Sequence, residues 1–83
     1  AVQVGIEKAR QVGIAYVGLI NTGHIGAAGS FATLAARAGL ICMVTGNDIP
    51  SVAAPGSRKA VLGSNPIAYG IPVTGSDPIL LDM

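Results

Sequence analysis

Apolar residues recur along the chain with different spacings, and these spacings predict the regular elements. Helical spacing over 2–12 predicts a helix that Gly13 ends, because glycine readily adopts the left-handed conformation of a helix C-terminus. Residues 14–20 form a continuous β-prone apolar run, which is typical of a strand buried on both faces. A second helix is expected over 26–38 and a second buried strand over 40–45.

The middle of the chain, residues 14–45, therefore has the order strand, helix, strand. Such a unit is normally a right-handed crossover between two parallel strands. Two more strands are expected at 66–71 and 78–82, joined by a hairpin loop at 72–77. The pattern predicts an α/β fold with a mixed sheet and flanking helices.

Residues 46–65 have no clear period and are rich in Gly, Pro, Ser and Asn. A structureless segment of this length is long for a compact domain and is usually functional or disordered. Because apolar residues such as Val52, Val61 and Leu62 are spread through it, we expect an ordered loop that packs against the rest of the chain.

The composition indicates that these residues are covered by further protein. The 83 residues are 51% hydrophobic and 11% charged, with a mean hydropathy of +0.62. An ordinary domain has about 25% charged residues, so this chain has too few charges to coat a small independent domain. Both ends also look cut within structural elements. We expect an internal fragment, with residues 1–83 forming part of one domain of a larger chain.

Charge and cysteine content exclude several classes of protein. The net charge of +1 gives no indication of a nucleic-acid or anionic membrane partner. No apolar run reaches the roughly 18–20 residues of a membrane helix. The single cysteine, Cys42, lies in an apolar run and is expected to be a buried, inert thiol. A cytoplasmic protein is expected.

The most informative motif is the glycine-rich segment 23–29 between the predicted strand and helix, where ligands bind in open α/β sheets. Three interpretations remain open. The first is a dinucleotide fingerprint, although Gly23, Gly26 and Gly29 do not have the spacing Gly-x-Gly-x-x-Gly. The second is tight glycine packing, with His24 as a helix cap or satisfied polar residue. The third is a catalytic histidine whose neighbouring glycines leave room for substrate.

His24 is the only histidine, and imidazole exchanges protons near neutral pH. When a 2-hydroxy acid is oxidised, the hydroxyl proton must be removed as hydride leaves the same carbon. One imidazole within hydrogen-bond reach can accept that proton and return it in the reverse direction. No metal is expected, because His24 has no Cys or acidic ligands at matching spacing.

Several ordered blocks resemble the type 2 malate/L-lactate dehydrogenase family, a group of non-Rossmann NAD(P)-dependent oxidoreductases that also includes ureidoglycolate and sulfolactate dehydrogenases and cyclic-imine reductases. The similarity covers most of 14–83. The blocks are Gly23 to Gly29 with the helix that follows, Asn47 to Pro55, Leu62-Gly63-Ser64-Asn65-Pro66-Ile67-Ala68, Ile71-Pro72 and Leu80-Leu81-Asp82-Met83.

The resemblance implies roles for particular residues. His24 matches the family's catalytic acid/base. Asp48, Asp82 and Met83 match cofactor contacts, although the family often has a small polar residue in place of Asp48. The wall of the substrate site is expected to include Gly23, Ser64 and Asn65.

The family's fold is a non-Rossmann cofactor-binding fold, so residues 1–83 are expected to form part of an NAD(P)-binding and catalytic domain. The implied reaction is hydride transfer between NAD or NADP and a small 2-oxo or 2-hydroxy acid such as malate, lactate, sulfolactate or ureidoglycolate. The resemblance also implies a homodimer and no independent activity for this part alone. The alternatives are a cyclic-imine reductase and a non-catalytic α/β scaffold whose glycine-rich loop binds an anion.

Overall fold

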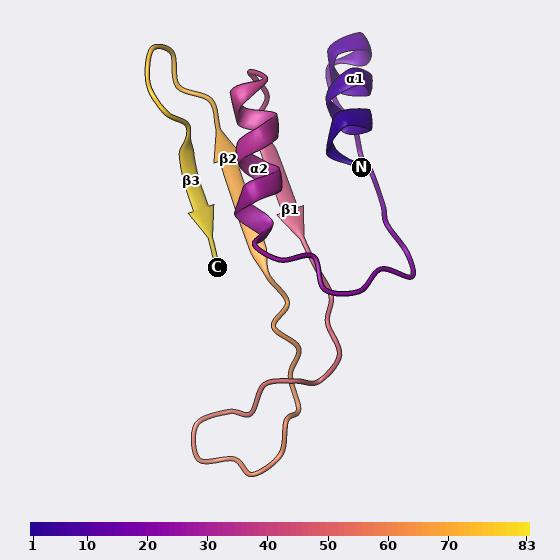
Figure 1. Ribbon diagram of the computed structural model, residues 1–83, viewed down its shortest axis with the longest axis vertical. Helices are drawn as coiled ribbons and strands as arrows, with labels where there is room; N and C mark the ends of the chain where they lie inside the picture. Colours follow the sequence, from indigo (N-terminus) through magenta and orange to yellow (C-terminus); the bar gives the residue numbers. More distant parts are fainter.

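The computed structural model describes all 83 residues and contains two helices and one three-stranded sheet (Figure 1). The α/β class is therefore confirmed. In chain order the elements are α1 (Val2–Val12), α2 (Ala28–Arg37), β1 (Cys42–Thr45), β2 (Ile67–Ile71) and β3 (Ile79–Asp82).

The sheet is antiparallel throughout, so the mixed strand direction that we expected is not found. β2 is the central strand; it places Gly70 opposite Cys42 of β1 and Ala68 opposite Asp82 of β3. The predicted hairpin between β2 and β3 is confirmed, with Ile71 opposite Ile79 beside the turn. Antiparallel strands can be joined by short hairpins, whereas parallel strands need a crossover connection.

The prediction of a strand at 14–20 is wrong, so the predicted parallel crossover is wrong as well. This segment is irregular, and no backbone–backbone hydrogen bond joins any residue from 14 to 26 to another part of the chain. Tyr16 is 94% exposed and Ile20 is 86% exposed. A strand needs a neighbour to accept and donate its backbone hydrogen bonds, and residues 14–20 pair with none, although β1 and β3 each have one free edge.

The helices follow the predictions more closely. Helix α1 has the predicted bounds, and Gly13 ends it at φ 92°, with its N–H donating to the carbonyl of Ala9. Helix α2 begins at Ala28 rather than at 26, because Gly26 adopts φ 73° and Ala27 is extended. It ends at Arg37, one residue before the predicted end, and Gly39, expected to terminate it, follows at φ 84°.

The core consists of small residues at the contact between α2 and the sheet. Ala28 and Ala32 of α2 pack with Ala68 of β2, and Val44 of β1 packs against them. A Cβ atom added at Gly70 would collide with the carbonyl oxygen of Ala32, so the helix backbone lies almost directly on the strand. Small residues on both elements permit this close approach, and the helix is thereby fixed over the sheet.

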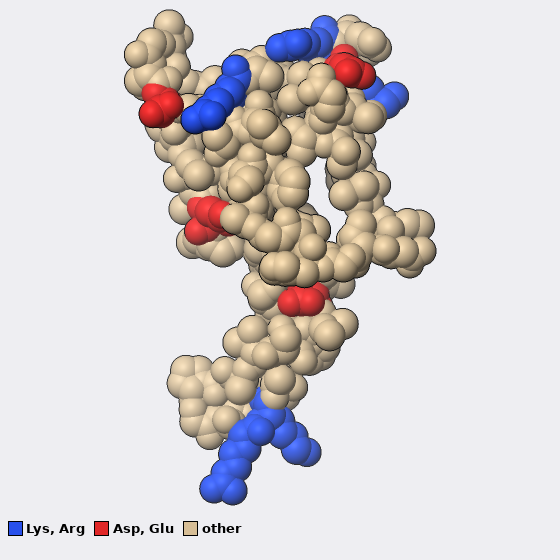
Figure 2. Space-filling model, viewed as in Figure 1, with Lys and Arg blue, Asp and Glu red and all other residues tan.

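The loop between β1 and β2 extends away from the sheet and helices (Figure 1), so the packing that we expected for 46–65 is wrong. Its two limbs form one isolated β-bridge, between Val52 and Leu62, and both residues are exposed. Figure 2 shows basic side chains at the far end of this loop, whose only basic residues are Arg58 and Lys59.

Much apolar surface is left uncovered. The radius of gyration is 15.0 Å, against about 12 Å for a compact domain of this length. On the sheet face opposite α2, Met43, Ile79 and Leu81 are all exposed. The exposure fits the expectation, drawn from composition, that further protein covers this chain. Neither helix has the length and apolar character needed to cross a membrane.

Cys42 lies on β1 and is half-buried, as a free thiol. Burial raises the pKa of this thiol, which keeps it protonated at neutral pH. The expectation of an inert thiol therefore agrees with its surroundings, although its burial is only partial.

Candidate active site

The segments that carry the candidate residues converge at one end of the sheet, the lower end in Figure 1. The N–H of Gly46, just after β1, donates to the carbonyl of Pro66, just before β2, at 3.0 Å. Ile67 and Met83 exchange backbone hydrogen bonds of 2.8 and 2.9 Å. The first turn of α2 is joined to the end of β3. Four of the five motif blocks, 23–29, 47–55, 62–68 and 80–83, therefore meet at this end, whereas 71–72 lies at the other end of β2.

His24 lies in the irregular segment that leads into α2, and its side chain is exposed. No hydrogen bond or ion pair involves the imidazole. A Cβ atom added at Gly23 or Gly26 would meet no atom within 4 Å beyond its chain neighbours, so the space around this segment is open. The interpretation of His24 as a helix cap or satisfied polar residue is wrong, since the N-cap of α2 is Ala27.

Asp82, at the end of β3, supplies the cap that α2 lacks. Its Oδ2 accepts a hydrogen bond of 2.9 Å from the N–H of Gly29, a residue 53 positions earlier in the chain. Helix α2 has no acidic residue in its first turn and no side-chain N-cap. A carboxylate at this position satisfies a free N–H group and is attracted by the partial positive charge of the helix N-terminus.

Asp48 joins the two limbs of the long loop at its base. Its Oδ2 accepts hydrogen bonds from the hydroxyls of Ser64 at 3.0 Å and Ser51 at 3.3 Å, and its Oδ1 accepts one from the N–H of Ile49 at 2.8 Å. The Asp48 N–H donates to Oδ1 of Asn65 at 3.0 Å. The hydrogen bond from Ser64, followed by that from Ile49, lowers the pKa of the Asp48 carboxyl.

Gly63 makes this cluster possible. A Cβ atom at Gly63 would collide with the carbonyl of Asp48 and would lie 2.6 Å from Oδ1 of Asn65. Asn65 itself adopts φ 40°, a left-handed conformation that asparagine tolerates better than most residues. The sequence Gly63-Ser64-Asn65 is thus shaped to hold the base of the loop closed.

A groove of about 470 Å³ runs along α2 beside β3 and includes Ala27, Gly29, Leu80 and Asp82 in its walls. It runs from Ala27, at the end of α2 that the His24 segment precedes, to Arg37 in the last turn of the helix. Met83, which follows directly after β3, is exposed.

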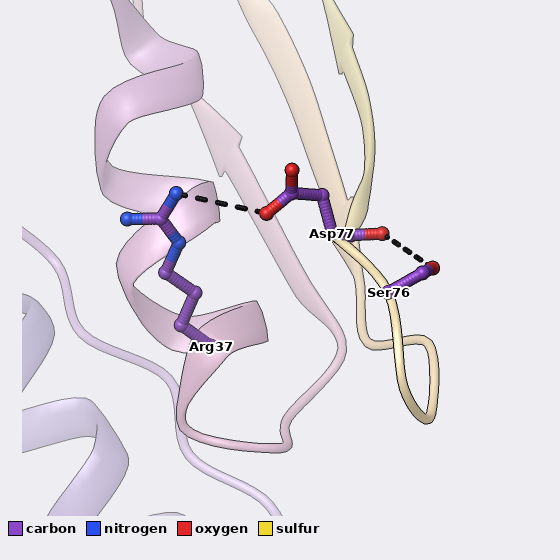
Figure 3. A network of polar contacts seen from close by, with 3 residues as sticks. All are labelled: Arg37, Ser76 and Asp77. Carbon is purple, nitrogen blue, oxygen red and sulfur yellow. Dashed lines mark hydrogen bonds and ion pairs between the residues drawn. The ribbon is translucent and has the colours of Figure 1, made fainter.

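A second open cavity, of about 490 Å³, lies by the C-terminal end of α2 and the β2–β3 hairpin loop. There Arg37 and Asp77 approach to 3.9 Å, and the Ser76 hydroxyl donates to the Asp77 carbonyl at 3.1 Å (Figure 3). Both charged side chains are largely exposed, at 67% and 96%. The contacts are typical of a weak surface pair rather than of a reactive site.

The structure brings only some of the predicted site residues into direct contact. Asp48, Ser64 and Asn65 form one hydrogen-bonded cluster, and Asp82 contacts the helix that follows His24. The side chains of His24 and Met83 form no hydrogen bond to any of them. Sequence reasoning missed Gly29 as the partner of Asp82, and Ile49 and Ser51 as partners of Asp48. Nothing in the local pattern signals a contact over 53 positions.

The sequence model of the malate/L-lactate dehydrogenase family matches residues 1–83, so the chain belongs to this family. It is 45% identical over 83 residues to a malate dehydrogenase from Pyrococcus abyssi, which aligns all of this chain with 23% of that protein. It is 43% identical over 72 residues to an L-sulfolactate dehydrogenase from Methanothermobacter thermautotrophicus, covering 87% of this chain and 21% of that protein. The predicted family resemblance is confirmed.

The structure of a malate dehydrogenase from Pyrococcus horikoshii OT3 has the same local fold, with a TM-score of 0.85 and 41% identity over 99% of this chain and 23% of that chain. Two other relatives carry a cofactor in their names. They are a (2R)-3-sulfolactate dehydrogenase (NADP(+)) from Chromohalobacter salexigens, 36% identical over 100% of this chain and 26% of that protein, and a ureidoglycolate dehydrogenase (NAD(+)) from Escherichia coli O157:H7, 38% identical over 94% and 22%. The chain thus spans between 21% and 26% of these relatives.

Proposed function

We propose that the full-length protein containing residues 1–83 transfers a hydride between a nicotinamide cofactor and a small 2-oxo or 2-hydroxy acid. These residues would form part of its NAD(P)-binding and catalytic domain. The observation that carries the proposal is the exposed, unpaired imidazole of His24 in an open glycine-containing segment, at the end of the sheet where four of the motif blocks converge. Relatives named as dehydrogenases of malate, sulfolactate and ureidoglycolate support this class of substrate.

His24 is the proposed acid/base. When a 2-hydroxy acid is oxidised, Nδ1 or Nε2 of the neutral imidazole accepts the proton of the C2 hydroxyl, and in the reverse direction the imidazolium returns it to the 2-oxo oxygen. Because both ring nitrogens are free of protein partners, neither is committed to another bond. Gly23, Ser64 and Asn65 are the proposed wall of the substrate site; in this chain the Ser64 hydroxyl is directed to Asp48.

A nicotinamide cofactor would accept the hydride from C2 of the substrate when bound. The residues at the end of β3 fit part of such a molecule, because the groove beside Asp82 is open, Oδ1 of Asp82 has no protein partner, and Met83 is exposed. Asp48 fits less well, since its two carboxylate oxygens already accept three hydrogen bonds. NAD and NADP are both candidates, as the names of the relatives include each.

Substitution of His24 in the full-length protein tests the proposal. His24→Ala is expected to lower kcat by about 10²–10⁴-fold, the usual range for a general acid/base. The dissociation constant for NADH, measured by fluorescence titration, is expected to stay within about threefold, because the imidazole acts on the substrate. Arg58→Ala, at the far tip of the loop, serves as the control. Unchanged turnover of a 2-oxo acid panel by His24→Ala would reject the role.

The same panel separates the alternatives. A non-catalytic scaffold would bind no NADH and turn over none of the acids. An imine reductase would bind NADH and reduce a cyclic imine in preference to the 2-oxo acids. The anion-binding scaffold has less support, because the carboxylate of Asp82 already lies at the N-terminus of α2, where an anion would bind. We also propose that the full-length protein is a cytoplasmic homodimer with no nucleic-acid or membrane partner. Light scattering of the full-length protein tests whether it is a dimer.

A further inference from the structure

We propose that Asp82 is a positioning residue that sets the location of His24 through the first turn of α2. This inference rests on the proposed function and deepens it. It gives Oδ2 of the Asp82 carboxylate a role on the protein side of the groove, in addition to the cofactor contact proposed for the end of β3.

The segment that carries His24 has few attachments of its own. No backbone–backbone hydrogen bond joins any residue from 14 to 26 to another part of the chain, and the His24 side chain has no partner. Its position therefore depends on the elements at its two ends. On the C-terminal side, His24 is four residues before Ala28, where α2 begins.

The first turn of α2 is joined to the sheet by the packing of Ala28 against Ala68 and by one side-chain hydrogen bond. Oδ2 of Asp82 accepts from the Gly29 N–H at 2.9 Å, and it is the only carboxylate that contacts this helix end. Asp82 is itself fixed in the register of β3 opposite Ala68. The carboxylate thus joins the beginning of α2, and the segment leading into it, to the rigid edge of the sheet.

Gly29 is shaped for this contact. A Cβ atom added there would lie 2.6 Å from Oδ2 of Asp82 and 3.0 Å from its Cβ and Cγ. Any side chain at Gly29 therefore displaces the carboxylate from the helix. Since Gly29 is not at a left-handed φ, the close approach of Asp82 accounts for the glycine without a need for unusual backbone conformation. Gly29 and Asp82, which are 53 positions apart in the sequence, therefore have complementary shapes at this contact.

This fit gives a test in which the contact is broken from either side in the full-length protein. Asp82→Ala removes the acceptor, whereas Gly29→Ala keeps Asp82 and pushes it away. Each is expected to lower kcat by about 10²-fold, the loss that a displacement of about 1 Å can cause in a reacting group. The double variant should be no worse than the poorer single variant, because both remove one contact. Asp82→Asn, which keeps an acceptor oxygen, should have a kcat at least about tenfold higher than that of Asp82→Ala.

Turnover at saturating NADH separates positioning from cofactor contact. At saturating NADH, Asp82→Ala and Gly29→Ala are expected to lose kcat to a similar extent, whatever the change in the NADH dissociation constant, with Asp77→Asn in the neighbouring hairpin loop as a matched control. A rise of tenfold or more in that constant for Asp82→Ala, with Gly29→Ala unaffected in kcat, would overturn the inference. So would full multiplicative losses in the double variant.

A readout independent of turnover keeps this inference separable from the proposed function. Hydrogen–deuterium exchange of the peptide spanning residues 21–30 should be faster in Asp82→Ala and Gly29→Ala than in the wild type and Asp82→Asn. If the wild type turns over no 2-oxo acid, the proposed function fails, while faster exchange would still establish the attachment. Unchanged exchange in both variants would overturn it, whatever the activity. If Asp82→Ala does not fold, the comparison of kcat and exchange between Asp82→Asn and Gly29→Ala provides the test.

Discussion

The contact between α2 and β2 is closely packed, whereas residues 14–20 lie in solvent, although both regions are almost entirely apolar. Ala32 and Ala68 have no exposed surface, while Tyr16 and Ile20 are almost fully exposed. In these two regions the buried side chains are small, and most of the large ones are exposed. Apolar character alone therefore does not bury a segment: a surface of complementary shape must be present in the same chain.

The largest effect is expected where the packing is tightest. Gly70→Ala in the full-length protein should lower the free energy of unfolding by about 3 kcal/mol, the upper range for overpacking, because the methyl would collide with the backbone carbonyl of Ala32. Urea unfolding monitored by circular dichroism measures the change. Thr74→Ala in the exposed hairpin loop is the control, expected within about 0.5 kcal/mol. A loss below about 1 kcal/mol for Gly70→Ala would mean that α2 is not held against β2 as described.

The second prediction concerns the exposed region. In this chain Ile20 is 86% exposed, so its truncation would cost almost nothing if the segment stayed in solvent. The relatives are several times longer, and we expect other parts of the full-length protein to cover 14–20. Ile20→Ala should then cost about 2 kcal/mol, the lower range for truncating a buried aliphatic side chain. A cost near zero, with fast amide exchange over 14–20, would show that the contrast between the two regions persists in the full-length protein.

The contrast also explains which elements could be predicted. Helix α1 was predicted at its observed bounds because its signals are local: a helical apolar period and Gly13. The β2–β3 hairpin was predicted for the same reason, from two short β-prone runs with a turn between them. The strand at 14–20 failed because β structure depends on a partner, which no local pattern contains.

The candidate site likewise has features that the sequence predicts and features that it does not. The resemblance singled out Asp48, Ser64 and Asn65 separately, yet their hydrogen-bonded cluster appears only when the two limbs of the loop meet. Asp82 was expected to contact a cofactor, and its partner in the structure is Gly29, on a different element. The candidate residues could be selected from the sequence, whereas their contacts with other elements could be found only in the folded structure.

A smaller effect is expected at the base of the long loop, an exposed region that, unlike 14–20, has its own attachments. Asp48→Ala removes the acceptor that joins Ser51, Ser64 and the Ile49 N–H. The loop should then open more often, and trypsin should cleave after Arg58 or Lys59 severalfold faster. Asp48→Asn, which keeps one acceptor oxygen, should be intermediate. Equal cleavage rates in all three proteins would mean that the cluster does not hold the limbs together.

The pH dependence of this cluster follows from the lowered pKa of the Asp48 carboxyl. A carboxyl with a pKa lower in the folded state than in the unfolded state stabilises the fold above its unfolded value, about 3.9, and this contribution is lost as pH falls through the folded value. The loop should therefore stay closed at neutral pH and open only in acid below about pH 4. A carboxyl NMR titration should give Asp48 a midpoint below 3.9, and a midpoint above it would contradict the three hydrogen bonds.

The smallest effect is expected for the ion pair between Arg37 and Asp77, at the end of α2 away from His24. The charged atoms are 3.9 Å apart and both side chains are mostly in water, so their coupling in a double-mutant cycle should be below about 0.5 kcal/mol. Arg37 also lies in the last turn of α2, where a cation is favoured by about 0.3–1 kcal/mol. Arg37→Ala should therefore cost more than Asp77→Ala, and raising the salt concentration should reduce both costs. Equal costs with a coupling above about 1 kcal/mol would mean that the pair, rather than the helix end, accounts for the effect of Arg37.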